Sequence, residues 1–117
     1  MAQQKIDIDI KDAGEYKVLK PTGDLDVYTV GSLRDAIGSM IDQTSTKVVV
    51  DLDDVPFMDS SGLGALMGGV RRLREAGGDL AIACTREQHL KLFTITGFGE
   101  GVSISPTVDE AAKGFRV

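Results

Sequence analysis

The sequence predicts an α/β fold in which a single mixed β-sheet of four to five strands carries about four packed α-helices. Near the N-terminus, an alternating segment, a turn and a second apolar segment predict an antiparallel hairpin. Further along, an uninterrupted β-branched run predicts a buried central strand. Repeated helix and strand units then follow the hairpin, and this order implies one sheet with helices packed on it.

The predicted hairpin spans residues 6–21. Ile6, Ile8 and Ile10 alternate with charged residues, which is the period of two shown by a strand with one solvent-exposed face. Residues 12–15, Asp-Ala-Gly-Glu, have the composition of a turn. Residues 16–20 are therefore expected to pair back antiparallel, with the strand ending at Pro21.

A helix and then the central strand are predicted next. Residues 23–26, Gly-Asp-Leu-Asp, lead into a helix whose apolar residues recur on one face. The residues of that face are Val30, Leu33, Ile37 and Ile41. Residues 47–52, Lys-Val-Val-Val-Asp-Leu, form an uninterrupted β-branched run, which suits a strand buried on both faces.

A second helix is predicted to begin after residues 59–62, Asp-Ser-Ser-Gly, and to end at Gly77 and Gly78. Its apolar stripe comprises Leu63, Leu66, Met67, Val70 and Leu73. Residues 80–84 predict the next apolar strand.

The last third of the sequence predicts a third helix followed by two short elements. Residues 85–88, Thr-Arg-Glu-Gln, fit a capping box at the start of this helix. Leu90 and Phe93 are expected to face inward before Gly97 ends the helix. A short strand at residues 102–104 and a terminal helix from about residue 107 complete the prediction.

Length and charge limit the classes of function. The 117 residues fit a single domain, residues 1–117, because domains usually have roughly 100 to 150 residues. The formal charge of -5 would repel a nucleic-acid backbone. The apolar stretches fall short of the roughly 20 residues that span a bilayer, and residues 1–4 lack the basic and apolar regions of a signal peptide. We expect a cytoplasmic protein that binds neither nucleic acid nor membrane directly.

Cysteine and histidine each occur once. Cys84 has no cysteine partner, so an internal disulfide and a multi-cysteine zinc site are excluded, and we predict a buried thiol. His89 is also alone, which removes most histidine-based metal sites, and it is predicted to lie on the surface of a helix. The sequence therefore predicts no metal site and no cofactor.

The segment from Val55 to Gly64 is the main candidate for function, because it joins a buried strand to a helix at the sheet edge where an α/β fold gathers its loops. Ser60 and Ser61 have two interpretations. A hydroxyl at the first turn can cap the helix, which contributes about 1 kcal/mol. Alternatively, one of the serines is a functional hydroxyl.

The helix that follows is nearly bare on its predicted outer face. Gly64, Gly68 and Arg71 lie opposite the apolar stripe, with Ala65 and Arg72 beside them. A helical glycine costs up to ~1 kcal/mol relative to alanine. Glycines on an exposed face allow close approach of a partner's backbone, whereas close packing of the helix on its own sheet is the competing explanation.

Three segments carry a resemblance to a known family. Residues 57–64 (Phe-Met-Asp-Ser-Ser-Gly-Leu-Gly), 23–26 and 48–52 closely resemble the anti-sigma factor antagonists, which are the free-standing members of the STAS domain family. The resemblance covers nearly the whole chain and implies a STAS fold. It implies that Ser60 accepts phosphate, with Ser61 as the adjacent second candidate.

The resemblance also implies the partners. The unphosphorylated protein would bind an anti-sigma factor that is also a serine kinase, and so free a sigma factor. Phosphorylation would release the antagonist until a phosphatase of the PP2C type restores it. The implied partner-binding residues are Asp24, Asp26, Asp59, Ser60, Ser61, Gly62, Gly64 and Gly68. Asp26 also has a purely structural interpretation, as a cap or turn residue.

Parts of the sequence also resemble proteins of three other functions. Residues 50–54, Val-Asp-Leu-Asp-Asp, are similar to the phosphoacceptor strand end of a receiver domain, but the first strand is not followed by the acidic pair that would hold Mg²⁺. An enzyme is disfavoured, because the chain has no P-loop, Ser60 has no Gly-x-Ser-x-Gly context, and His89 is the only candidate base of a catalytic triad. A non-sigma STAS subunit of a larger signalling complex remains an alternative.

Overall fold

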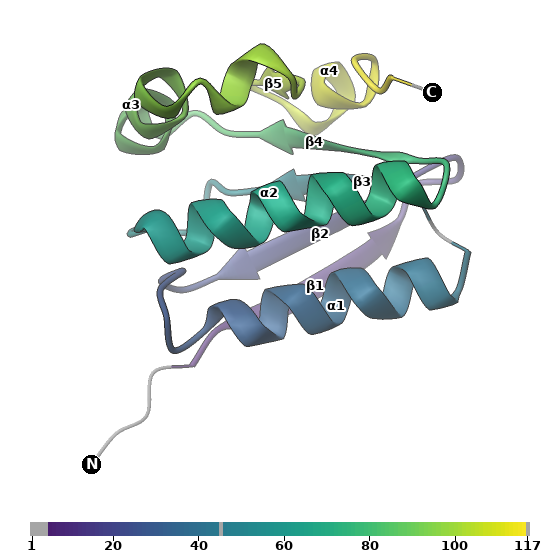
Figure 1. Ribbon diagram of the computed structural model, residues 1–117, viewed down its shortest axis with the longest axis horizontal. Helices are drawn as coiled ribbons and strands as arrows, with labels where there is room; N and C mark the ends of the chain where they lie inside the picture. Colours follow the sequence, from purple (N-terminus) through teal and green to yellow (C-terminus); the bar gives the residue numbers. More distant parts are fainter. Residues whose placement is uncertain (1–4, 45, 117) are drawn as a thin grey trace.

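The computed structural model describes residues 5–44 and 46–116. Residues 1–4, where the sequence predicts no signal peptide, lie outside the described part. Its five-stranded sheet has the order β1-β2-β3-β4-β5. The strands are β1 (Asp7–Asp12), β2 (Lys17–Thr22), β3 (Lys47–Asp51), β4 (Asp79–Ala83) and β5 (Ile104–Ser105). The helices are α1 (Val30–Asp42), α2 (Ser60–Glu75), α3 (Glu87–Thr96) and α4 (Val108–Ala112), with a 3-10 helix, η1 (Phe98–Glu100). The prediction of one mixed sheet with four helices is confirmed (Figure 1).

The hairpin of β1 and β2 is antiparallel, and the other neighbouring strands run parallel. Gly14 has a φ of +91°, which a residue with a side chain rarely adopts, and its N–H donates to Asp12 Oδ1 at 2.9 Å. The expectation that the second strand ends at Pro21 is wrong, because β2 continues to Thr22 and Pro21 pairs with Ile8. The ladder to β3 ends earlier, at Leu19, so Pro21 lies where β2 has one unpaired edge.

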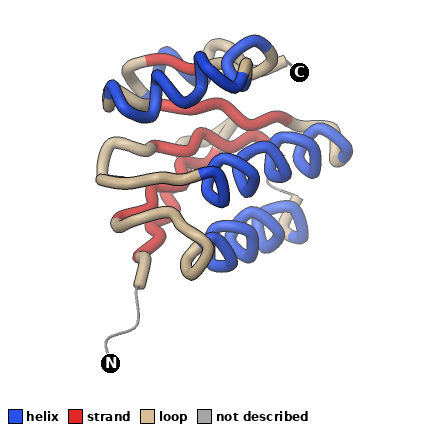
Figure 2. The backbone as a smooth tube through the Cα atoms, turned by 60° about the vertical axis from the view of Figure 1, so that its left-hand side comes forward, coloured by secondary structure: helices blue, strands red, loops and turns tan. Residues whose placement is uncertain are grey.

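Helices cover both faces of the sheet. α1 and α2 lie side by side across one face, as Figures 1 and 2 both show. β3 is the central strand, and Val48 and Val50 point into the main core beneath these helices. On the opposite face, Val49 packs with Ala81, Ala83 and Ala111 of α4. Burial on both faces explains why the β3 sequence does not alternate.

The helix faces differ from the prediction at individual positions. In α1, Met40 is buried, whereas the predicted Ile41 is only partly buried. In α2, the predicted inward residue Met67 is half-exposed, whereas Ala65, predicted beside the outer face, is buried. Leu63, Leu66, Val70 and Leu73 are buried as predicted.

The elements after residue 84 agree with the prediction apart from two differences. Residue 85 does not begin a capping box, because α3 has Arg86 at its N-cap position and no side-chain cap. The last strand covers Ile104–Ser105 rather than residues 102–104. Gly97 ends α3 in a left-handed conformation, and the Thr107 side chain caps α4 by accepting from the Glu110 N–H. Among the residues that the structure describes, no helix is both long and apolar enough to cross a bilayer.

Cys84 follows β4 and is buried, as predicted. Burial raises the pKa of its thiol, because the thiolate would lose hydration. We expect iodoacetamide at pH 8 to alkylate the folded protein at least about tenfold more slowly than the urea-unfolded chain, since the thiolate is the nucleophile. Stability should also fall as the pH rises above the ordinary thiol pKa, because the unfolded chain then ionises first. Equal alkylation rates for folded and unfolded protein would contradict this expectation.

Candidate functional site

The N-terminus of α2 carries the two candidate serines. Asp59 has an extended backbone and is the N-cap residue, and its Oδ1 accepts from the N–H of Ser61 at 2.8 Å and of Gly62 at 3.4 Å. The capping interpretation of the serines is therefore wrong, because the Asp59 carboxylate caps the helix. Ser60 is exposed at the first helical position, and Ser61 is partly buried. The structure leaves the Ser60 side chain open to solvent.

The loop before α1 lies directly beside this helix start. Leu25 forms a parallel bridge with Met58, its N–H donates to the Phe57 carbonyl at 2.9 Å, and its carbonyl accepts from the Asp59 N–H at 3.2 Å. These bonds bring Asp24 and Asp26 alongside residues 57–59. The sequence segments are more than 30 residues apart, so only the tertiary fold unites them.

Asp26 also has a local structural role. Its Oδ1 accepts from the Tyr28 N–H at 2.9 Å, while the Thr29 hydroxyl bonds the Asp26 N–H and the Asp24 carbonyl. These contacts are those of a turn aspartate. The structural interpretation of Asp26 is confirmed. The same turn lies next to the start of α2, and the partner-binding role of Asp26 stays a prediction.

The glycines of α2 divide into two groups. A methyl group at Gly64 or Gly68 would meet no other atom within 4 Å, so both positions lie on an open surface. A methyl group at Gly62 would lie 2.6 Å from Met58 Cγ and 3.0 Å from Leu25 Cβ. The prediction that Gly62 leaves room for a partner is corrected, because the protein's own interior requires glycine there. Gly69 is also an internal contact, facing Ile37 and Leu80.

The two arginines predicted near this bare face behave differently. Arg71 is exposed, as expected for the outer side of α2. Arg72 reaches across to α1, where its Nη1 donates to the Arg34 carbonyl at 3.3 Å. A side chain at Gly38 would collide with the same guanidinium. Gly38 of α1 therefore leaves room for the Arg72 side chain. The open strip of α2 is limited to the region around Gly64 and Gly68.

Several apolar side chains near the start of α2 and in the loop before α1 are exposed, and the sequence did not predict their exposure. Tyr28 is 80% exposed and Val27 is 65% exposed in the loop before α1. Phe57 and Met67 are about half exposed, one before α2 and one on it. Exposed apolar groups gathered on one region typically mark a protein interface. Two adjacent apolar residues, Val27 and Tyr28, in an otherwise polar loop could have indicated an exposed apolar patch. Met67 could not, because its position in the apolar stripe of the helix predicts burial.

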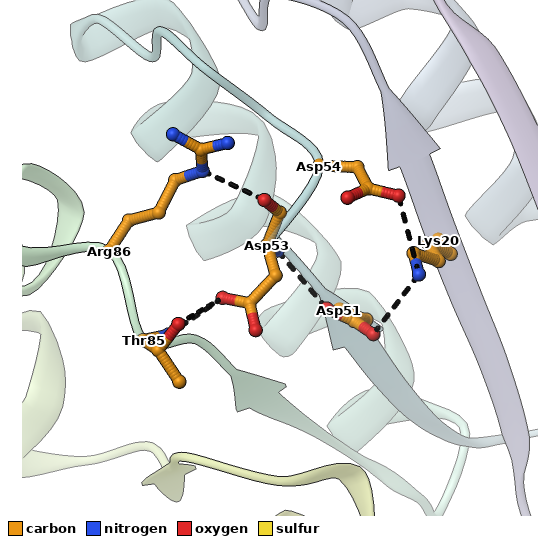
Figure 3. Close-up of polar contacts among 6 residues, drawn as sticks. All are labelled: Lys20, Asp51, Asp53, Asp54, Thr85 and Arg86. Carbon is orange, nitrogen blue, oxygen red and sulfur yellow. Dashed lines mark hydrogen bonds and ion pairs between the residues drawn. The ribbon is translucent and has the colours of Figure 1, made fainter.

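The acidic residues at the end of β3 and in the loop after it contact neighbouring side chains (Figure 3). Lys20 Nζ lies 3.3 Å from Asp54 Oδ2 and 4.0 Å from Asp51 Oδ2, and the hydrogen bond to Asp54 raises the pKa of Lys20. Asp53 Oδ1 accepts from the N–H and the hydroxyl of Thr85. In residues 5–44 and 46–116, no group of three metal-ligating side chains has the arrangement of a metal site. In the structure these carboxylates bind Lys20 and the segment before α3.

The surface prediction for His89 is wrong. Its side chain is 2% exposed, and Nε2 lies 2.6 Å from the carbonyl oxygen of Val55 in the loop before α2. Sequence could not reveal this contact, because the two residues are 34 positions apart. The buried ring is bonded to the backbone and does not face solvent as a free base.

A family model of the STAS domain matches residues 7–111. The chain belongs to the STAS domain family. An anti-sigma-B factor antagonist of Bacillus subtilis is 31% identical over 100 residues, which cover 86% of this chain and 91% of the relative. This likeness supports membership of the anti-sigma factor antagonist group within the family.

Solved structures agree with this STAS assignment. An anti-sigma factor antagonist from Mycobacterium paratuberculosis superposes with a TM-score of 0.84 at 25% identity, covering 96% of this chain and 95% of the other. The phosphorylated form of the Bacillus cell fate determinant SpoIIAA gives a TM-score of 0.71 at 27% identity, covering 92% of this chain and 97% of the other. The predicted STAS fold is confirmed.

Proposed function

We propose that this STAS protein is a phosphorylation-controlled anti-sigma factor antagonist that acts in the cytoplasm. In its unphosphorylated form it binds an anti-sigma factor with serine kinase activity, and the bound anti-sigma factor releases its sigma factor. Phosphate on Ser60 ends the binding, and a PP2C-type phosphatase removes it. The protein is a substrate of phosphoryl transfer and not an enzyme, and it needs no cofactor, metal, nucleic acid or membrane.

The exposed Ser60 at the start of α2 carries this proposal. Its neighbour Asp59 caps the helix, so the cap does not depend on the exposed Ser60 hydroxyl. A phosphoserine carries about -1.5 to -2 charges, and the free amides and dipole at a helix N-terminus stabilise such a charge. The fold can therefore accept the modification. Ser61 is the weaker candidate because it is partly buried and its own N–H is bound by Asp59.

The surface around Ser60 supports a protein partner. Gly64 and Gly68 leave an open strip along α2, and Tyr28 and Phe57 offer exposed apolar contacts beside it. Aromatic side chains and close backbone approach are common features of protein interfaces. The carboxylates of Asp24, Asp26 and Asp59 give the docking surface a negative end, where added phosphate would repel.

The relatives support the same conclusion. The Bacillus subtilis relative is an anti-sigma-B factor antagonist, and SpoIIAA has been solved in a phosphorylated form. Both are similar to this chain over at least 86% of its length.

A phosphorylation assay tests the proposal. The protein is incubated with ATP and each candidate anti-sigma factor kinase, and the added phosphate is located by mass spectrometry. We expect one phosphate on Ser60, full loss of labelling in Ser60→Ala, and at least half of the labelling rate in the matched control Ser61→Ala. Labelling of Ser61 alone would move the acceptor by one residue. No labelling by any kinase that binds the protein would contradict the switch and favour a non-sigma STAS subunit.

A further inference from the structure

The loop from residue 52 to residue 59, which leads to Ser60, is held by the segment that begins α3. Asp53 Oδ1 accepts from the Thr85 N–H at 2.7 Å and from the Thr85 hydroxyl at 3.0 Å. Arg86 Nε donates to the Asp53 carbonyl at 2.8 Å (Figure 3). Two residues further along the loop, the Val55 carbonyl is bonded to His89 at 2.6 Å. The proposed function uses none of these side chains.

The contact between His89 and Val55 is the most deeply buried of these bonds. A carbonyl oxygen can only accept, so the proton of this hydrogen bond belongs to Nε2 of His89. Val55 is fully buried and His89 is nearly so, which keeps bulk solvent away from this bond. A buried carbonyl that loses its donor is unfavourable, and the loop would shift to bond elsewhere.

The opposite side of the loop is bound through backbone groups. The Asp54 carbonyl accepts from the Gly23 N–H at 3.1 Å, and the Phe57 carbonyl accepts from the Leu25 N–H at 2.9 Å. The buried side chains of Leu52, Val55 and Met58 also anchor the loop in the core. Loss of one hydrogen bond from His89 should therefore move the loop without detaching it.

We propose that His89 is a positioning residue for the phosphoacceptor, acting through the Val55 carbonyl on the loop that ends at Asp59 and Ser60. This inference rests on the proposed function of Ser60. In that reaction the Ser60 oxygen forms a bond to the γ-phosphorus of ATP while the bond to ADP breaks, and the hydroxyl proton passes to a basic side chain of the kinase. Such a displacement depends on geometry, and a shift of about 1 Å can reduce the rate by up to ~100-fold.

Two substitutions separate the hydrogen bond from the volume of the ring. His89→Leu removes the donor and keeps an apolar group of similar size, whereas His89→Gln keeps an N–H donor. Ile82→Val, in β4 where Ile82 pairs with Val50 and Ile104, is the control for general loss of core packing. The first measurement is amide hydrogen exchange at Val55 and Asp59, whose N–H groups donate to the carbonyls of Leu52 and Leu25, and it needs no kinase. The second is the rate of Ser60 phosphorylation by the kinase that labels the unaltered protein.

For His89→Leu we expect exchange at Val55 and Asp59 to be about tenfold faster and phosphorylation about five- to twentyfold slower, with the fold retained. His89→Gln should recover most of both values, and Ile82→Val should change neither selectively. Unchanged exchange in His89→Leu would overturn the inference whatever the kinase does. Faster exchange with an unchanged phosphorylation rate would also overturn it, while leaving Ser60 as the acceptor. If the unaltered protein were never labelled on Ser60, the proposed function itself would fail.

Discussion

Replacing Ser60 with aspartate is expected to weaken binding of the anti-sigma factor about a hundredfold, with little change in the free energy of unfolding. A unit-charge pair 4 Å apart repels by about 1 kcal/mol in water and by about 4 kcal/mol at an effective dielectric of 20. In the free protein the aspartate at position 60 is repelled by Asp24, Asp26 and Asp59 through water, at the cost of about 1 kcal/mol. Docking removes this water and raises the cost to about 4 kcal/mol, so binding loses about 3 kcal/mol, or roughly a hundredfold in affinity. Phosphoserine carries more charge and should weaken binding further.

The matched control for this substitution is Ser60→Asn, which is close in size to aspartate and has no charge. Isothermal titration calorimetry against the purified anti-sigma factor gives the affinities, and urea denaturation gives the stability of each variant. We expect Ser60→Asn to retain binding within about tenfold of the unaltered protein, because only steric bulk is added. Equal losses for the asparagine and aspartate variants would show that shape, not charge, controls release. Undiminished binding by Ser60→Asp would contradict the proposed switch.

Salt provides a second test of the electrostatic explanation. At 0.15 M ionic strength the screening length is about 8 Å, and at 1 M it is about 3 Å. The difference in affinity between the asparagine and aspartate variants should therefore shrink as salt rises, if the charges stay partly hydrated at the edge of the interface. A difference that is independent of salt would place the added charge in a fully dehydrated contact.

The order of elements followed from the sequence because the local signals agreed with one another. The β-branched run of β3, the turn at Gly14 and the left-handed end of α3 at Gly97 each depend on nearby residues. Hydrophobic periodicity also identified most of the inward face of α2. Periodicity predicts which side of a helix faces the core, but not whether a neighbouring element covers every residue on that side. For that reason Met67 was predicted to be inside and is half-exposed.

The site was predictable only in part, for the same reason. The Asp-Ser-Ser-Gly motif located the start of α2 and its neighbouring carboxylates, but the cap that it predicts as one interpretation of the serines is supplied by Asp59. His89 and Thr85 were given surface and capping roles because their actual partners, Val55 and Asp53, lie more than 30 residues away. Long-range hydrogen bonds of single polar side chains leave no periodic signal in a sequence.

The glycines of α2 give the second prediction with a large effect, because they separate binding from folding. Gly64→Leu adds a side chain where a methyl group meets nothing within 4 Å. Leucine also forms helix better than glycine, by up to ~1 kcal/mol. The variant should therefore be as stable as the unaltered protein or more so, yet bind the anti-sigma factor at least about tenfold more weakly, because its side chain fills the space of the partner.

Gly62→Ala should behave in the opposite way. Its methyl group would lie 2.6 Å from Met58 Cγ, and overpacking of this kind typically costs about 1 to 3 kcal/mol of stability. Molecules that remain folded should keep more of their affinity for the partner than Gly64→Leu does, since no group is added to the open strip. Urea denaturation and calorimetry on the same two preparations make the comparison. Normal binding by Gly64→Leu would mean that the partner does not dock on this strip, and Ser60 would then have to act from the rim of an interface centred elsewhere.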